Sequence, residues 1–400
     1  MTDTHLTPKQ IPERARHWHS TQIEWRRHLH QYPELSTQEV KTTRYIKERL
    51  KELNIKVLPL DMPTGVLAEI KGGKTGPTVA IRSDIDALPV CEQTGLPFAS
   101  KIEGKMHACG HDVHMATVMG TAAILAENRK QLAGNIRLIF QPAEEQPPGG
   151  ARPMIKHGAL KGVDTIFGLH VDPLIPIGKV GLRDGAMMAA VYDFDLVIKG
   201  KGGHAAQPHM AVDAIVTAAE VVSSLQTIVS RERGPMSPLV ISLGRIEGGG
   251  ARNVVADRVS IIGTARTLSD KMLKALPKMI RKTVGGVCKA RGATFEMTEV
   301  ANYPPLINTP AVNRLYQSAF GRMFGKSKVI QLDALLGGED FACYLQKVPG
   351  AMFRLGIRNT AIKADKPWHS PEFIVDEEAI YYGTSLLVSA TLDYLQSAHR

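Results

Sequence analysis

The spacing of hydrophobic residues divides the first half of the chain into alternating strands and helices. Short apolar runs predict buried strands, and longer stretches with an apolar residue every three to four positions predict helices. The predicted strands are 66–70, 78–81, 136–140 and 165–169. The predicted helices between the last three of these strands are 113–130 and 149–157. Strands that alternate with helices in this way indicate a mostly parallel sheet that is covered by helices.

Two further helices are expected before the first strand. The first passes through Trp25 and Leu29 and ends near Pro33. Ser36 and Glu39 follow with the spacing of a capping box, in which a hydroxyl and a carboxylate bond the first turn of a helix. We therefore expect the second helix to start at this pair and to end near residue 53.

A different order of elements begins near residue 187. The pattern predicts strands and helices in the order β-α-β-β-α-β, at 191–199, 210–229, 239–245, 254–267, 269–291 and 293–300. This order is typical of the ferredoxin-like unit, which is a complete module by itself. We therefore expect an α/β catalytic domain formed by 1–186 and 301–400, with an inserted α+β lid or dimerisation domain at 187–300. Helices near 312–324 and 377–397 and a strand near 351–355 would return to the first domain.

Composition limits the classes to which such a protein can belong. The four cysteines are scattered and form no C-x-x-C pair, so a disulfide framework or a zinc ribbon is not indicated. The formal charge of +10 is spread along the chain without a basic tract, which favours solubility and attraction of anionic substrates over nucleic-acid binding. No apolar run is long enough to span a bilayer, and the N-terminus lacks the pattern of a secretory signal. We expect a cytoplasmic protein.

Side chains that bind metals are concentrated at 107–114 and at the ends of the predicted strands. Cys109 and His111 are two positions apart, so in an extended segment they point to the same side. Further candidates follow three strands and a late loop, at Asp84, Glu144, Glu145, His170 and His369. Because the carboxyl ends of parallel strands meet at one edge of a sheet, we expect these side chains to converge. They are enough to bind two divalent ions and leave one carboxylate over.

Each of these residues also has a simpler explanation. A single cysteine or histidine is more often a packed or hydrogen-bonded core residue than a ligand. Asp84 and Asp86 can cap the turn after their strand, and adjacent glutamates are common in solvated turns. His114 can simply cover the polar face of its helix, and His107 and Asp112 are supporting residues in our interpretation. The agreement of several strand ends with the Cys-x-His segment favours the metal site.

A second class of function is suggested by Gly200–Ala205, which matches G-x-G-x-x-A between a strand and a helix. This pattern is found in dinucleotide-binding oxidoreductases. The acidic residue expected about twenty positions later would close a second parallel strand, but Glu220 lies inside a predicted helix. We interpret the glycines as allowing close approach of the backbone, so that His204 can donate to a substrate oxygen.

Ordered motifs along nearly the whole chain resemble the aminoacylase-type metal-dependent amidohydrolases. This family includes hippurate hydrolases, N-acyl-amino-acid deacylases, auxin-conjugate hydrolases and related carboxypeptidases. The motifs are RRHLH (26–30), HACGHD (107–112), QPAEE (141–145), GLH (168–170), GGHAAQPH (202–209), NVV (253–255), GTAR (263–266), GEDF (338–341) and HSP (369–371).

The resemblance implies a role for each matching residue. The implied metal ligands are Cys109, His111, Glu145, His170 and His369. The resemblance makes Glu144 the general base and His204 the oxyanion donor, often supplied by the partner subunit. Asn253 and Arg266 would contact the substrate backbone and carboxylate, and Asp84 would orient a ligand imidazole. The implied cofactors are two divalent ions, which this mixed ligand set allows to be zinc, manganese, cobalt or nickel.

The expected reaction is cleavage of the amide bond of N-acyl or N-aroyl amino acids, or of short peptides with a free carboxylate. Metal-bound hydroxide would attack the acyl carbonyl, with a glutamate as general base. A carboxypeptidase or dipeptidase using the same site is the alternative within this class. The expected partners are a small carboxylate substrate and further copies of the chain, as a dimer or tetramer through the inserted domain.

Overall fold

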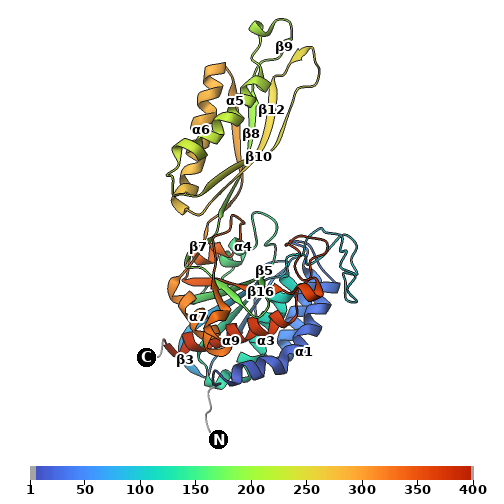
Figure 1. Cartoon of the computed structure of the whole chain (residues 1–400), viewed down its shortest axis with the longest axis vertical. Helices are drawn as coiled ribbons and strands as arrows, with labels where there is room; N and C mark the ends of the chain where they lie inside the picture. The colour runs from blue at the N-terminus through green and yellow to red at the C-terminus, as the bar shows by residue number, and fades with distance from the viewer. Residues whose placement is uncertain (1–5, 398–400) are drawn as a thin grey trace. The chain divides into compact units, whose positions relative to one another are not determined.

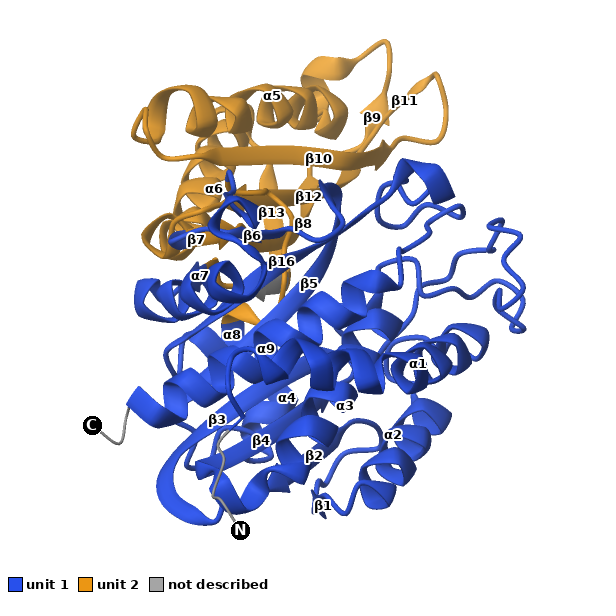
Figure 2. Cartoon of the chain, turned by 60° about the horizontal axis from the view of Figure 1, so that its bottom comes forward, with its two compact units in different colours: residues 1–185, 307–333, 343–400 blue, residues 186–306, 334–342 orange. Residues whose placement is uncertain are grey.

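The computed structural model describes residues 6–397, except for the side chains of residues 301 and 302. The chain forms two compact units. Unit 1 comprises 1–185, 307–333 and 343–400, and unit 2 comprises 186–306 and 334–342 (Figure 2). The segment 187–300, which we expected to be inserted, lies within unit 2. That unit also takes in two short stretches outside the segment.

Unit 1 is built on an eight-stranded mixed sheet in the order β1-β2-β4-β3-β5-β16-β6-β15. Its centre, β4-β3-β5-β16, is parallel, whereas β1 and β2 add on in antiparallel fashion. The strands are β1 (Lys56–Leu58), β2 (Val66–Ile70), β3 (Lys74–Asp84), β4 (Ala133–Gln141), β5 (Thr165–Pro176), β6 (Val180–Leu182), β15 (Val329–Gln331) and β16 (Gly350–Arg358). The predicted mostly parallel α/β sheet is confirmed.

Helices cover this sheet and enclose the main hydrophobic core. They are α1 (Gln10–Gln31), α2 (Val40–Glu52), α3 (His111–Glu127), α4 (Ala151–Lys156), α7 (Pro310–Phe324), α8 (Ala342–Leu345) and α9 (Glu378–Ser397). Helix α3 packs against α1, α9 and the sheet, with α1 and α9 beside it in Figure 1. Only Glu127 at its end escapes burial, so α3 is buried on every side and is not an amphipathic surface helix. The residues that begin α3 are therefore held in a rigid, buried position.

Two sequence expectations for unit 1 differ from the structure. Helix α2 begins at Val40, and neither the Ser36 nor the Glu39 side chain bonds its first turn. Strand β5 does not stop at His170 but continues to Pro176, because the residues after His170 keep pairing with β16. His170 therefore lies inside a strand, and the residues before and after it in the chain both pair with β16.

Unit 2 has its own core and a four-stranded antiparallel sheet in the order β10-β12-β8-β13. The strands are β8 (Ala190–Lys199), β10 (Leu239–Gly248), β12 (Arg258–Thr267) and β13 (Thr294–Tyr303). Helices α5 (Ala214–Thr227) and α6 (Asp270–Arg291) pack together and bury their apolar faces against the sheet. This confirms the ferredoxin-like order of elements that the sequence predicts. Strands β9 (Gly203–His204) and β11 (Val254–Val255) pair as a small two-stranded sheet, and β7 (Gly185–Met188) and β14 (Leu306–Asn308) form another.

The glycine-rich segment Gly200–Ala205 does not have the geometry of a dinucleotide-binding turn. It follows β8, which runs antiparallel to both of its neighbours, and it leads into β9. The next α-helix begins only at Ala214. A dinucleotide site needs a parallel strand that turns directly into a helix, so the oxidoreductase alternative is not supported.

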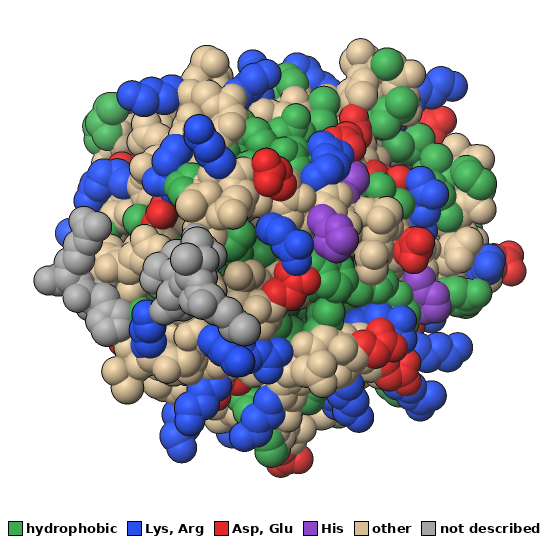
Figure 3. All heavy atoms as spheres, turned by 90° about the horizontal axis from the view of Figure 1, so that it is seen from below, with side chains coloured by type: hydrophobic (Ala, Val, Ile, Leu, Met, Phe, Trp, Pro, Cys, Tyr) green, Lys and Arg blue, Asp and Glu red, His purple; other side chains and the backbone are tan. Residues whose placement is uncertain are grey.

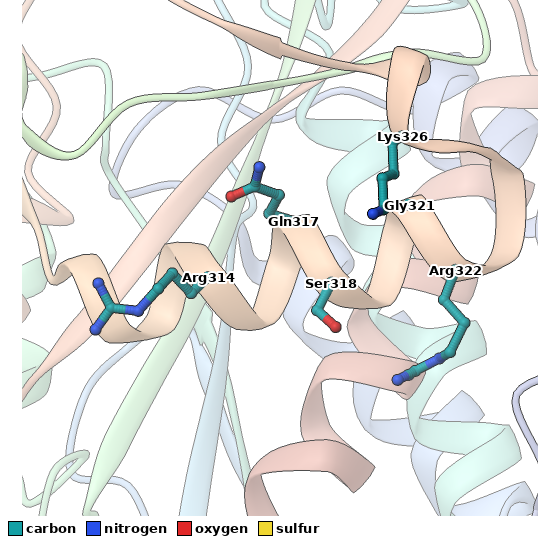
Figure 4. Close-up of a pocket in the computed structure, with 6 residues that line it drawn as sticks. All are labelled: Arg314, Gln317, Ser318, Gly321, Arg322 and Lys326. Carbon is teal, nitrogen blue, oxygen red and sulfur yellow. The ribbon is translucent and has the colours of Figure 1, made fainter.

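The described surface carries charged side chains of both signs (Figure 3) and a hollow along α7. On the face drawn in Figure 3, lysine and arginine side chains are interspersed with acidic ones. A hollow of about 500 Å³ lies along α7, lined by Arg314, Gln317, Ser318, Gly321, Arg322 and Lys326 (Figure 4). Arg322 donates to Ser389 and Asp393 of α9, which ties the two helices together. None of the helices described is long and apolar enough to cross a membrane.

The alternation along β12 yields a matched test of the unit 2 core. Ile261 is fully buried between the sheet and its helices, whereas its neighbour Ile262 is 44% exposed on the other face. We expect Ile261→Ala to lower the free energy of unfolding by about 2–5 kcal/mol, because it leaves a cavity. Ile262→Ala should change that free energy by only about 0.5 kcal/mol. Urea denaturation measures both, and equal losses would contradict the packing described.

Candidate metal centre and active site

Unit 1 brings together side chains from β3, the start of α3, the turn after β4, the middle of β5 and a loop before α9. Donor atoms that lie within 4.8 Å of one another form overlapping groups. One group is Cys109, His111 and His170, and another is Cys109, Glu145 and His369. The five side chains that the sequence proposes as ligands are therefore neighbours, although they are spread over 260 residues from Cys109 to His369.

His111 is oriented by the strand end that carries Asp86. Its Nδ1 donates to the backbone carbonyl of Asp86 at 2.9 Å and lies 3.3 Å from the Asp86 carboxylate. Its Nε2 lies 3.7 Å from carboxylate oxygens of both Asp84 and Glu145, and it has no hydrogen-bond partner among the described residues. The ring thus presents a free nitrogen to a cluster of acidic oxygens, as metal-binding imidazoles do.

His114 and Asp84 form a second buried pair beneath this cluster. His114 Nδ1 donates to Asp84 at 2.7 Å, and His114 Nε2 accepts the backbone N–H of Val171 at 2.9 Å. Arg82 also donates to Asp84, at 2.8 Å. Both His114 and Asp84 are fully buried. The pair therefore connects the end of β3 to β5 directly after His170.

The remaining donors face one another across short distances. Cys109 Sγ lies 3.5 Å from His170 Nε2, and Glu145 Oε1 lies 3.5 Å from His369 Nε2. His170 Nδ1 donates to the Val171 carbonyl, which leaves its Nε2 toward the sulfur. His369 is held in a left-handed conformation with φ +66°, and its N–H donates to the Ala108 carbonyl. This bond joins the late loop to the segment that carries Cys109.

Electrostatics in this cluster are set by burial and by mutual charges. Burial and the nearby Glu145 and Glu144 charges raise the pKa of the Cys109 thiol well above its usual value. Burial alone would lower the pKa of His111, but the Asp84 and Asp86 carboxylates outweigh it and raise the pKa to about 10. Metal ligation needs a thiolate and a neutral imidazole, so binding of a cation would displace a proton from each of these two side chains.

The arrangement fits divalent cations well. Soft sulfur, imidazole nitrogen and carboxylate oxygen converge, a mixed set that suits first-row transition metals. His111 Nε2 and Glu145 Oε1 are buried polar atoms without a hydrogen-bond partner among the described residues. Such atoms cost free energy unless something binds them, and a cation would satisfy both.

Glu144 lies at the same turn, next to Glu145. One of its oxygens falls within 4.8 Å of donor atoms of His111 and Glu145. The turn is fixed by the N–H of Glu145, which donates to Asp86 at 3.0 Å. The side chain of Glu144 is partly accessible, in contrast to the carboxylates beneath it. An accessible carboxylate at the edge of a metal-binding cluster is well placed to exchange protons with a bound water or substrate.

Three sequence-predicted residues belong to unit 2. His204 on β9 and Asn253 before β11 are both exposed and line one hollow of about 700 Å³. Arg266 lies near the end of β12 that is farther from β11, with its guanidinium 3.9 Å from Asp193. Unit 2 therefore brings His204 and Asn253 together, and it does not place Arg266 with them.

Asp86 and His114 contribute to the site in a way that the sequence does not predict. Both look like capping or surface residues in the sequence, yet both are buried and bond the cluster. The D-x-D spacing of Asp84 and Asp86 is a sequence signal for the role of Asp86, because it places both carboxylates on one side of an extended strand end. His114 carries no comparable signal, because α3 is buried on every side.

Comparison with known proteins gives consistent results. The model of "Peptidase family M20/M25/M40" matches residues 80–393. The chain is 42% identical over 364 residues to N-acetylcysteine deacetylase of Bacillus subtilis, covering 91% of this chain and 94% of that protein. It is 39% identical over 364 residues to thermostable carboxypeptidase 1 of Saccharolobus solfataricus, covering 90% and 92%.

A solved structure shares the fold across the whole chain. The Bacillus subtilis YXEP protein, a dinuclear metal binding peptidase from the M20 family, superimposes with a TM-score of 0.84 at 38% identity. The match covers 95% of this chain and 99% of the other. With its ligand cluster, its two units and these matches, the chain belongs to the M20/M25/M40 peptidase family and is a metal-dependent hydrolase of amide bonds.

Proposed function

We propose that the protein hydrolyses the amide bond of N-acyl or N-aroyl amino acids. The observation that carries this proposal is the convergence in unit 1 of five metal-binding side chains with Glu144 beside them. The similarity to a deacetylase that acts on N-acetylcysteine supports this substrate class. The similarity to a carboxypeptidase keeps short peptides with a free carboxylate as the second candidate. Both substrate types present an amide next to a carboxylate, so one site can serve either.

We assign Cys109, His111, Glu145, His170 and His369 as the ligands of two divalent cations. When bound, such ions lower the pKa of a water and polarise a carbonyl. Asp86 fixes the ring of His111, and Asp84 holds His114 against β5 next to His170. These carboxylates would keep the imidazoles in the orientation that binding requires.

Glu144 is the proton carrier in this proposal. Its carboxylate takes a proton from the attacking water as the water oxygen forms a bond to the acyl carbon. The protonated Glu144 then donates to the nitrogen of the leaving amine while the carbon–nitrogen bond breaks. The products are a carboxylic acid and an amino acid. His204 would stabilise the oxyanion, and Asn253 and Arg266 would bind the substrate backbone and carboxylate.

The role of Glu144 can be separated from metal binding. We expect Glu144→Gln to lower kcat by about 10²–10⁴-fold, because the isosteric amide cannot accept the proton. The bound metal, measured by plasma mass spectrometry, should stay at the wild-type ratio. Glu145→Gln is the matched control at the adjacent position, and it should lose metal. Metal loss in the Glu144 variant would reassign that residue as a ligand.

Substrate class can be tested together with Arg266. A panel of N-acetyl, N-benzoyl and indole-acyl amino acids and dipeptides, assayed with several added metals, identifies the class. We expect Arg266→Ala to raise KM for carboxylate substrates by about tenfold or more with kcat little changed, as loss of a ground-state contact does.

The matched control is Arg258→Ala at the other end of β12, where the side chain is exposed. Substrates with a carboxamide in place of the carboxylate should not distinguish wild type from the Arg266 variant. An unchanged KM for the carboxylate substrates would remove Arg266 from the binding site.

We also propose that the protein is a homo-oligomer, a dimer or a tetramer, that associates through unit 2 and supplies His204 to the partner's site. This proposal is supported by the solvent exposure of His204 and of the apolar side chains near it. Val254, which pairs with His204 in the β9–β11 sheet, is 54% exposed, and Met210 is 62% exposed. Apolar groups exposed together commonly mark an interface.

Complementation tests this shared site. His204→Ala and Glu144→Gln chains, each inactive alone, are unfolded, mixed and refolded. In a symmetric dimer, half of the molecules are mixed and each has one intact site, so about a quarter of wild-type activity returns. If His204 serves its own chain, the mixture stays inactive.

A further inference from the structure

Glu39 is a fully buried carboxylate that bonds the turn preceding the two glutamates of the site. Its Oε1 accepts the N–H of Ala143 at 2.8 Å and the N–H of Thr37 at 3.0 Å. Its side chain bonds none of the N–H groups of α2, although it stands at the N-cap position. Burying a carboxylate costs free energy unless the group is hydrogen-bonded. The Glu39 side chain does not cap α2, so its hydrogen bond to Ala143, 104 residues away, indicates a different role.

Ala143 is held in a conformation that its side chain disfavours. Its φ is +52°, in the left-handed region, and it directly precedes Glu144 and Glu145. A non-glycine residue in this region costs on the order of 1 kcal/mol and persists only where its surroundings hold it. Both of its peptide groups are held, because Glu39 accepts its N–H and the N–H of Gly150 donates to its carbonyl at 3.0 Å.

The same segment also holds the backbone on the other side of Glu144. Ser36 Oγ donates to Asp86 Oδ2 at 2.7 Å, and this oxygen accepts the N–H of Glu145 at 3.0 Å. The N–H groups of Ala143 and Glu145 therefore end on two buried carboxylates. Glu144 lies between these two fixed points.

We propose that Glu39 is a positioning residue, whose carboxylate holds Ala143 in the left-handed turn and thereby aims Glu144 at the metal-binding cluster. This inference rests on the proposed function of Glu144. Glu39 acts through the backbone and does not touch the reacting atoms. The alternative is that Glu39 only stabilises the fold.

Kinetics of three variants distinguish these roles, with an N-acyl amino acid that the wild type cleaves as the probe. Glu39→Ala should lower kcat by about 10–100-fold, with KM and metal content within twofold of wild type, because the turn relaxes. Glu39→Gln keeps an acceptor oxygen for the Ala143 N–H and should stay within about threefold of the wild-type kcat. In the Glu39→Ala background, Ala143→Gly should recover part of kcat, because glycine adopts a positive φ without cost.

A stability-matched control is Leu50→Ala in α2, which removes a fully buried side chain far from the turn in sequence. It should lower the unfolding midpoint at least as much as Glu39→Ala while leaving kcat within twofold. If Glu39→Gln is as impaired as Glu39→Ala, or if Leu50→Ala loses as much kcat, the positioning role is wrong.

Hydrogen exchange provides a readout that does not depend on activity. The Ala143 amide should be protected in the wild type and in Glu39→Gln, and it should exchange at least tenfold faster in Glu39→Ala. Unchanged protection in Glu39→Ala would overturn the proposal. If the wild type cleaves no N-acyl amino acid or peptide, the proposed function is wrong. The exchange rate of the Ala143 amide would still show whether Glu39 holds the turn.

Discussion

The buried carboxylates at the end of β3 are the constraint on which the site depends. Asp84 and Asp86 are essentially without solvent contact, and each must be neutralised or bonded from within the protein. Burial alone would raise the pKa of Asp84, but the His111 and His114 rings and the Arg82 guanidinium hold it well below its usual range. Removing a single partner of such a buried pair costs about 3–5 kcal/mol. The imidazoles are therefore fixed in orientation by the need to satisfy the carboxylates.

This constraint reaches the candidate metal-binding atoms through two routes. Asp86 orients His111 through its ring nitrogen and anchors the turn of Glu144 and Glu145 through the N–H of Glu145. Asp84 acts through His114, which accepts the N–H of Val171 and so locks β5 directly after His170. Donors from β3, β5, the start of α3, the turn after β4 and the loop before α9 can form one cluster because the parallel sheet brings the ends of its strands to a shared edge.

The parts of the fold with a strong repeating pattern could be predicted from the sequence. The ferredoxin-like order of unit 2 follows from long alternating strands and amphipathic helices, and the parallel centre of unit 1 follows from strands separated by helices. The short strands β1, β6 and β15 were missed, because three residues carry too little periodicity to detect. The predicted end of a strand at His170 was wrong, since pairing with β16 continues beyond it.

For the site, residue type and spacing predicted which side chains would gather, but not how they are supported. Ser36 and Glu39 have the local spacing of a capping box, yet their bonds go to Asp86 and Ala143, 50 and 104 residues away. No local pattern records a tertiary hydrogen bond of this kind. The sequence likewise predicts Asp86 only as a turn residue. Its carboxylate and its backbone carbonyl contact His111 at the start of α3, and this contact between distant segments leaves no local sequence pattern.

Anomalous diffraction from crystals of the protein loaded with zinc, collected on both sides of the zinc edge, tests directly whether five side chains of unit 1 bind two cations. Two peaks are expected about 3.5–4 Å apart, with the Cys109 sulfur at about 2.3 Å from at least one ion. His111, Glu145, His170 and His369 should complete the two coordination shells. A single peak, or peaks that leave the Cys109 sulfur unbound, would contradict the account.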